Sequence, residues 1–186
     1  MGQLTAILKR KDGTVVEYDL VPRKVLEIGT PTHQKIVAKL SAEKFCAKTG
    51  KWEDRGILST RVVTTAFVNL LVDALQGISG ATINTFNRHD SGTGTNVESV
   101  VDIALQTPCG EAADIGSQIE GASANIYKSV AEHTYTTSGG FTITEHVIKN
   151  ADDIVMDRSV FADAGIPVDV DDVIRWTYQL SVVAGG

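Results

Sequence analysis

The most regular pattern of apolar and polar positions lies near the end of the chain. Between residues 173 and 183, every second position is apolar: Ile174, Trp176, Tyr178, Leu180 and Val182. The positions between them are polar: Arg175, Thr177, Gln179 and Ser181. Alternation with a period of two is typical of a β-strand with one buried face. The pattern therefore predicts a strand that places one face in a core and the other against water or a neighbour.

Shorter patterns of the same kind predict strands over residues 81–88, 124–137, 141–149 and 154–161. In the last of these, apolar residues occupy both sets of alternate positions, so we expect this strand to be covered on both sides. Residues 97–105 are compatible with a strand or a short helix, because periodicity cannot separate the two in so short a run.

The chain begins with two extended runs, residues 4–10 and 15–21. Asp12 and Gly13 lie between them, and an Asp-Gly pair favours the tight turn of a β-hairpin because that turn needs positive φ angles. From residue 22 to residue 57 the pattern is poorly periodic and is interrupted by Pro and Gly. We expect irregular or short-stranded structure there, with a short helix between His33 and Lys48 as a candidate.

A helix is predicted over residues 64–76. Its apolar residues recur at intervals of three and four: Phe67, Leu70, Leu71, Ala74 and Leu75. Thr64 or Thr65 can cap its first turn, and Gly77 follows its end. A single apolar stripe implies a single packing partner, which is most simply a β-sheet.

These elements indicate a mainly β fold: an antiparallel, jelly-roll-like β-sandwich with one helix and an N-terminal hairpin and arm. Strands do not alternate with helices, so a nucleotide-binding α/β fold is not expected. We predict two parts, an N-terminal hairpin and irregular arm over residues 1–58 and a β-sandwich domain over residues 59–186.

Composition narrows the range of partners. The chain has 186 residues, a formal net charge of −6 and a pI near 5.2, which disfavours binding to nucleic acid or to an anionic membrane. The longest apolar stretch, residues 62–75, is interrupted by polar residues and cannot span a bilayer. Cys46 and Cys109 match no metal-binding spacing and are expected to be reduced thiols.

Residues 86–95, with the sequence FNRHDSGTGT, suggest chemistry at first sight. Gly92 and Gly94 could let backbone amides converge on an anion, and His89 and Asp90 could act as an acid–base pair. The third glycine of a dinucleotide fingerprint and the Gly-Lys-Ser/Thr of a P-loop are both missing from the sequence. We therefore interpret the stretch as a sharp turn at the end of a strand, where short polar side chains cap the backbone.

Metal binding is the other chemical hypothesis, because His89, His133 and His146 could meet from three strands. The His-X-His pair with which such β-sandwich sites usually begin is missing from the sequence. No Gly-X-Ser-X-Gly elbow is present either. We therefore assign no catalytic, cofactor-binding or metal-binding residue and no cofactor.

Several blocks of sequence together resemble a family of small virion structural proteins of tailed bacteriophages. The blocks are Arg61–Thr65, Asp73–Gln76, Phe86–Thr95, Ala124–Tyr127, Ile143–His146, Asp157–Phe161 and Thr177–Leu180. The resemblance covers roughly residues 60 to 183. It departs from the family pattern at Val147–Lys149, where the family usually has Gly and an apolar pair, and the first sixty residues have no counterpart.

The resemblance implies a non-enzymatic structural component of a phage virion, and we expect a capsid decoration, or cement, protein that is assembled in the host cytoplasm. The expected partners are further copies of the chain, with a trimer favoured, and the major capsid protein or other virion proteins. Nucleic acid and membrane are not expected partners. The alternatives are a neck, tail or baseplate protein that could bind host glycans, and a metal-dependent β-sandwich enzyme that uses the three histidines.

Overall fold

The computed structural model describes residues 4–9, 15–20 and 35–183, with gaps at residues 62, 79, 81–82, 122 and 138–139. The chain forms two compact units, one over residues 1–33 together with Gly186 and one over residues 34–185. Each unit is described by itself.

The N-terminal unit contains an antiparallel pair of strands, β1 (Leu4–Lys9) and β2 (Val15–Leu20). The predicted hairpin strands are thus confirmed. The predicted Asp12-Gly13 turn and the predicted arm between residues 21 and 34 lie outside the described residues.

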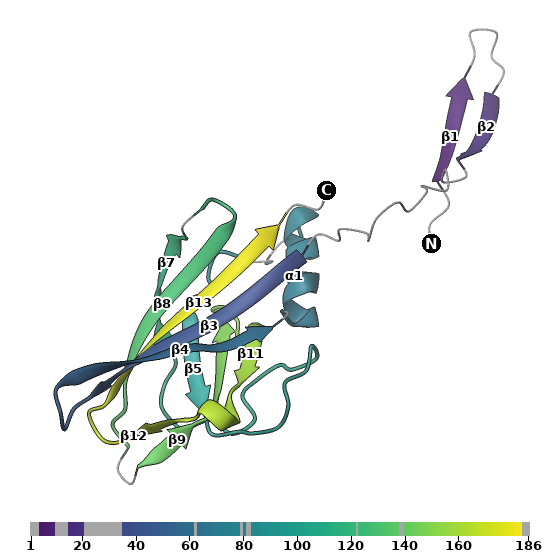
Figure 1. Cartoon of the computed structure of the whole chain (residues 1–186). Coiled ribbons are helices and arrows are strands. Elements are labelled where there is room, and N and C mark those ends of the chain that lie inside the picture. The colour runs from purple at the N-terminus through teal and green to yellow at the C-terminus, as the bar shows by residue number, and fades with distance from the viewer. Residues whose placement is uncertain are drawn as a thin grey trace. The chain divides into compact units, whose positions relative to one another are not determined.

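The larger unit is built on a five-stranded antiparallel sheet in the order β4-β3-β13-β8-β7 (Figure 1). Its strands are β3 (Lys35–Cys46), β4 (Lys51–Arg61), β7 (Ser117–Glu120), β8 (Ile126–Thr134) and β13 (Val173–Val183). The predicted C-terminal strand is confirmed as β13, the central strand of this sheet. Its residues Ile174, Trp176 and Tyr178 are buried, as their alternation predicts.

The expectation of irregular structure or a short helix before residue 57 is wrong for the described part of that region. Strand β3 runs for 12 residues through the proposed helix, and Ala38, Leu40 and Ala42 are buried at alternate positions. Two of these three residues are alanines, so the period of two is hard to recognise in the sequence. Since β3 and β4 belong to the main sheet, the units divide between His33 and Gln34 and not between residues 58 and 59.

A second antiparallel sheet has the order β11-β10-β5-β6. Its strands are β5 (Arg88–Gly92), β6 (Asp114–Ile115), β10 (Glu145–Lys149) and β11 (Val155–Val160). A small pair, β9 (Phe141–Ile143) with β12 (Ile166–Val168), and a 3-10 turn at Ala162–Ala164 complete the unit. Residues 93–110 form neither a regular strand nor a helix, so neither option for residues 97–105 is correct.

Helix α1 (Thr65–Leu75) confirms the predicted helix and its cap. The Thr64 hydroxyl accepts a hydrogen bond from the backbone N–H of Phe67 at 3.2 Å and donates one to the Val155 carbonyl at 2.5 Å. The cap therefore also joins the helix to β11. Gly77 follows the helix with a φ of +71°, a conformation in which a residue without Cβ is favoured.

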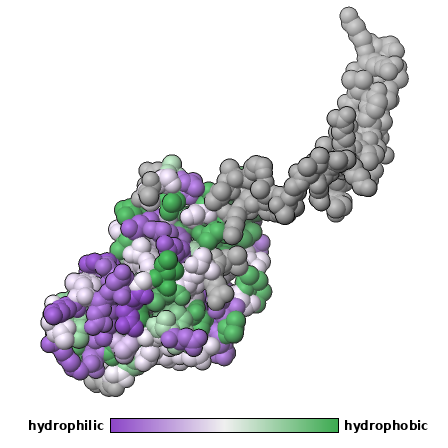
Figure 2. Space-filling model, in the orientation of Figure 1, coloured by the Kyte–Doolittle hydropathy of each residue, from purple (hydrophilic) through white to green (hydrophobic). Residues whose placement is uncertain are grey.

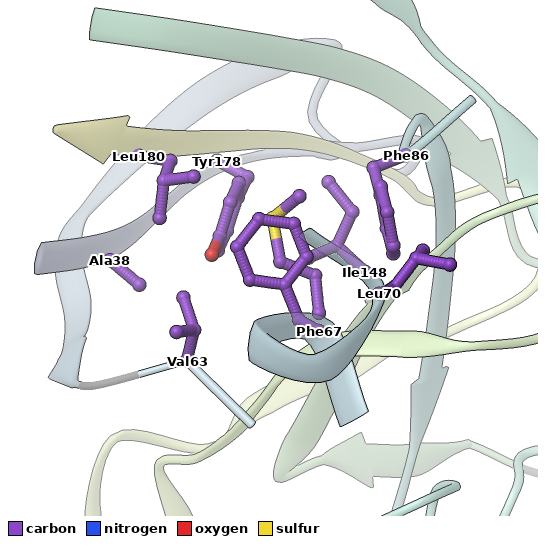
Figure 3. Close-up of a cluster of buried hydrophobic side chains, with 9 residues drawn as sticks. Ala38, Val63, Phe67, Leu70, Phe86, Ile148, Tyr178 and Leu180 are labelled. Atoms are coloured by element: carbon purple, nitrogen blue, oxygen red, sulfur yellow. The ribbon is translucent and has the colours of Figure 1, made fainter. Parts of the chain in front are cut away.

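The core lies between the two sheets and consists of two apolar clusters. The first cluster combines Phe67 and Leu70 of α1 with residues of both sheets, and the Phe67 ring meets the Phe86 ring edge-on at 5.2 Å (Figure 3). The second surrounds Trp176 and extends to β9 and β12. The molecule is therefore a mainly β, sandwich-like fold with one α-helix among the described residues, as predicted.

Strand β11 is covered on both sides, which confirms the expectation for this segment. All of its residues from Val155 to Ser159 are buried. One face meets the five-stranded sheet. Residues 93–110, which we call the covering segment, pack over the other face, where Ile103 and Leu105 line a hollow with Val147 and Val155.

Candidate functional site: buried polar groups and an exposed apolar surface

Two of the three candidate histidines meet in the core. His89 on β5 and His146 on β10 lie in adjacent rows of an antiparallel pair, in which His146 is opposite Ser91 and His89 is opposite Ile148. The His89 Nδ1 and His146 Nε2 atoms are 3.0 Å apart, and the two side chains are 1% and 0% exposed. His89 and Asp90 are neighbours in a strand and face opposite sides of it, so they do not form an acid–base pair.

The histidine pair connects the two sheets. His89 Nε2 lies 2.8 Å from the hydroxyl oxygen of Ser129, which belongs to β8 of the opposite sheet. The His146 ring packs against the Trp176 ring on β13, with centroids 4.7 Å apart. The two imidazoles therefore form a polar bridge through a largely apolar core.

Burial keeps both imidazoles neutral. It lowers the pKa of His89 to about 3 and lowers the pKa of His146 well below its ordinary value, with His89 as a second cause for His146. In a neutral pair, one ring donates the shared hydrogen and the other accepts it. Because the pair has no access to solvent, it can order the core but cannot meet a substrate.

The third histidine is in a different place. His133 Nδ1 is hydrogen-bonded to the Asp114 carboxylate of β6, and its ring packs edge-on against Tyr135 with centroids 4.5 Å apart. The three histidines thus do not converge on one point. Within the described ranges of the chain, no group of three or more His, Cys, Asp or Glu side chains is arranged to hold a metal ion.

The polar residues of β5 are used inside the fold. The Ser91 hydroxyl lies 2.9 Å from the Tyr135 hydroxyl and 3.8 Å from the Cys109 sulfur, and burial raises the pKa of Tyr135. On the other face of the strand, the Asp90 carboxylate forms an ion pair with Lys149 at 3.2 Å. Cys46 and Cys109 are both free thiols, as expected.

The strongest polar network was missed by sequence reasoning and centres on Glu145, which is completely buried. Its carboxylate accepts backbone hydrogen bonds from three residues of the covering segment, at 2.7–3.0 Å: Gly94, Gln106 and Thr107. Arg158 of β11 bonds the same carboxylate at 2.8 Å and reaches the Asp102 carboxylate at 3.0 Å. The network thereby fastens the covering segment to the second sheet at both ends.

The protonation state of Glu145 follows from these contacts. Burial opposes its ionisation, but the hydrogen bonds from Thr107 and Gln106 and the Arg158 guanidinium outweigh burial and hold its pKa below the ordinary value. Burial likewise opposes the charge on Arg158, whose pKa is nevertheless raised by Asp102 and Glu145. Glu145 and Arg158 therefore form a buried ion pair whose hydrogen-bonding groups are bound to other parts of the fold. Such a pair stabilises the structure and is not available to bind a substrate.

The interpretation of residues 86–95 as a sharp turn is wrong. Arg88–Gly92 is a strand, and neither Gly92 nor Gly94 has a positive φ angle. The glycines serve close packing instead: a Cβ atom at Gly94 would lie 2.5 Å from Glu145 Oε1 and 2.8 Å from Gln106 Cβ. The anion that this stretch surrounds is therefore the protein's own carboxylate.

A second buried ion pair fixes the end of β3. Lys44 Nζ lies 2.8 Å from the Asp172 carboxylate, and both side chains are at least nine-tenths buried. Asp172 also accepts the backbone N–H groups of Ala47 and Asp169. This pair ties the β3–β4 turn to the loop that precedes β13.

Trp52 lies on β4, in the region that the sequence reading left irregular. Its ring packs against Phe45, with centroids 5.5 Å apart, and the Arg175 guanidinium lies 4.3 Å from its centroid. Arg175 in turn contacts Glu43 and Glu132. The face of Trp52 that Arg175 covers is not free to stack on a sugar.

The outside of α1 and of the covering segment is unusually apolar. The exposed residues, which we call the apolar surface, are Val68, Val72, Leu75, Val97, Val100, Val101 and Ile103. A hydrogen bond of 2.7 Å from the Thr65 N–H to the Val100 carbonyl joins the helix to the segment. Two hollows of about 250 and 410 Å³ flank residues 103–105. In Figure 2, hydrophobic residues gather on the side that carries α1, whereas the β3–β4 end is largely hydrophilic.

Comparison with models of protein families, with curated proteins and with solved structures finds no match to this chain. Among the described residues, no helix is both long enough and apolar enough to cross a membrane.

Proposed function

We propose that this chain is a non-enzymatic structural component of a tailed-bacteriophage virion, and specifically a decoration, or cement, protein of the capsid. In this proposal the chain is assembled in the host cytoplasm, forms a homo-oligomer with a trimer expected, and binds the major capsid protein or a neighbouring virion protein. Neither nucleic acid nor membrane is a proposed partner, since the net charge is −6.

One observation carries the proposal: the blocks that resemble phage virion proteins contain the buried polar residues that hold the sandwich together. His89 and Gly94 lie in Phe86–Thr95, Glu145 and His146 end Ile143–His146, and Arg158 lies in Asp157–Phe161. Their polar atoms bond other parts of the fold. A pattern that maintains architecture and exposes apolar surface supports a binding role over turnover.

Apolar contacts between copies also fit the mechanical task of a cement protein. A shell under internal pressure is stabilised when many modest interfaces resist its expansion together, each burying about 1,000 Å² or more. The apolar surface on α1 and the covering segment could be buried in such an interface.

The experiment adds purified chain to phage heads assembled without it. The proposal predicts saturable binding to the heads and retention of packaged DNA at a higher temperature than in undecorated heads. Heads that neither bind the chain nor gain heat resistance would overturn the decoration role. Binding to isolated necks, tails or baseplates instead would favour the alternative placement.

A further inference from the structure

The apolar surface contains large apolar side chains that are mostly exposed to water. Leu75 is 81% exposed, and Val97 and Ile103 are 84% and 76% exposed, although all three are large apolar residues. The covering segment that carries two of them is hydrogen-bonded to Glu145 and Arg158 of the second sheet. Large apolar residues exposed together in this way mark contact sites.

The N-terminal hairpin has an apolar face that would be stabilised by a partner. Its register pairs Leu4 with Leu20, Ala6 with Tyr18 and Leu8 with Val16, and these pairs alternate with pairs that contain the polar positions. Since alternate positions of paired strands belong to the same face, the three apolar pairs share one face. An isolated two-stranded hairpin is marginally stable in water and gains stability when such a face is covered.

The chain between β2 and β3 has enough residues for this contact. Strand β2 ends at Leu20 and β3 begins at Lys35, which leaves 14 residues between them (35 − 20 − 1). At about 3.3–3.6 Å per residue, this connection reaches up to about 50 Å. Ile36 packs against the core cluster that contains Phe67 and Leu70, so β3 begins beside α1.

Charge favours the same contact. Residues 1–33 contain five Lys and Arg and four Asp and Glu, which gives them a net charge of +1. Since the whole chain has a net charge of −6, residues 34–186 have a net charge of −7. The basic run Lys9-Arg10-Lys11 begins at the last residue of β1. Asp73 in α1 and Glu98 and Asp102 in the covering segment are the acidic residues next to the apolar surface, and Asp102 is paired with Arg158. Opposite charges around an apolar contact steer association and fix its orientation.

We propose that the apolar surface of one copy is covered by the N-terminal hairpin of a neighbouring copy. The inference rests on the oligomeric role in the proposed function and names the contact that builds the oligomer. Each copy gives a hairpin and receives one, so the contacts can close into a ring without leaving an uncovered surface.

The test compares variants of the full chain by their mass in solution. Tyr18→Lys places a charge on the apolar face of the hairpin, and Glu17→Lys is its matched control on the other face. The double variant Val72→Lys, Leu75→Lys places two charges on the apolar surface. Lysine has a high helix propensity, and a cation is favourable near the C-terminus of a helix, so α1 should still form. Ile119→Lys, at an exposed apolar residue of β7, is the matched control for this surface.

We expect the wild-type chain and both controls to be oligomers, and Tyr18→Lys and the double variant to be monomers of 19.9 kDa. A mixture of the two monomeric variants should form a complex with the mass of two chains. In that complex the double variant supplies the hairpin and the Tyr18→Lys variant supplies the surface. Circular dichroism and a thermal melt of each variant establish that the sandwich is folded.

Three results would overturn the inference: a monomeric wild-type chain, variants that remain oligomeric, or variants that do not associate on mixing. Association of the two variants on mixing, in contrast, would exclude a hairpin that folds back on its own chain as the source of the oligomer. None of these results decides the proposed function, because binding of the wild-type chain to phage heads is measured separately.

Discussion

His89 and His146 share a hydrogen bond of 3.0 Å in the core of the sandwich, where neither ring reaches solvent. No carboxylate bonds either ring in the described part of the chain; the partners are each other and Ser129. Ile148 of β10 lies opposite His89 on one side and opposite Asp157 of β11 on the other. Asp157 is thus an acidic residue in the same row of the sheet as His89. The core is therefore ordered by two groups that must stay neutral.

This pair predicts a loss of stability in mild acid. The pKa of His89 is about 3 in the folded chain and 6.5 ordinarily, so the unfolded chain binds the proton first as the pH falls. The stability is complete above pH 6.5 and is lost as the pH falls from 6.5 towards 3. For one such histidine the loss is about 2 kcal/mol at pH 5, and His146 adds a loss in the same direction. Urea unfolding at pH 5 and pH 8 measures it.

Carboxylates do not imitate this effect, because the lowered pKa of Glu111 (about 2) affects stability only as the pH falls below about 4.5. His89→Leu combined with His146→Leu should remove most of the pH dependence between 5 and 7. His33→Gln, in the N-terminal unit, is the control and should leave it unchanged. An unchanged pH dependence in the double variant would contradict the account of a neutral pair.

Removal of the charge on Glu145 should weaken the attachment of the covering segment. Glu145→Gln leaves the buried Arg158 guanidinium without its closest anion, and breaking a buried pair typically costs roughly 3–5 kcal/mol. The exposed ion pair of Glu132 with Arg175 provides the control, since Glu132→Gln should cost less than about 1 kcal/mol. Chemical denaturation gives both values.

Hydrogen exchange gives the local evidence for the same variant. The amides of Gln106 and Thr107 donate to Glu145 and should exchange faster in Glu145→Gln, while amides of β13 should change only with global stability. Equal acceleration in both places would show that the carboxylate does not hold this segment specifically.

A methyl group at Gly94 should be poorly tolerated. A Cβ atom there would lie 2.5 Å from Glu145 Oε1 and 2.8 Å from Gln106 Cβ, so the covering segment would have to move outwards. We expect Gly94→Ala to destabilise the chain by roughly 1–3 kcal/mol. Thr95→Ala, at the exposed neighbouring position, should change stability by less than about 0.5 kcal/mol. A thermal melt compares the two variants, and equal melting temperatures would refute the packing role.

The sequence predicts best those elements whose apolar residues are large and regularly spaced. Strand β13 and helix α1 belong to this group, and the Thr64 cap follows from its residue type at a helix start. Strand β3 was mistaken for irregular structure because alanines occupy two of its buried positions. Because alanine is small and only weakly apolar, it does not show in the sequence which face of a strand is buried.

The candidate site was harder to predict for a different reason. Strand β5 has the sequence RHDSG, and its polar residues are buried because partners far along the chain satisfy them. Glu145 and Arg158 lie on neighbouring strands, and Gln106 and Thr107 come from the segment above them. A charged residue inside an apolar strand, as in ITEHVI, is the one signal in the sequence that could have indicated a buried pair.

The proposed role is that of a structural protein of the phage head. Cryo-electron microscopy of intact particles that contain the chain tests it most directly, because the density of a sandwich with this two-sheet topology can be located on the particle. The account predicts the chain in many copies on the outer surface of the head shell, in contact with the major capsid protein. Density for the chain only at the neck, tail or baseplate, or none on the particle, would contradict it.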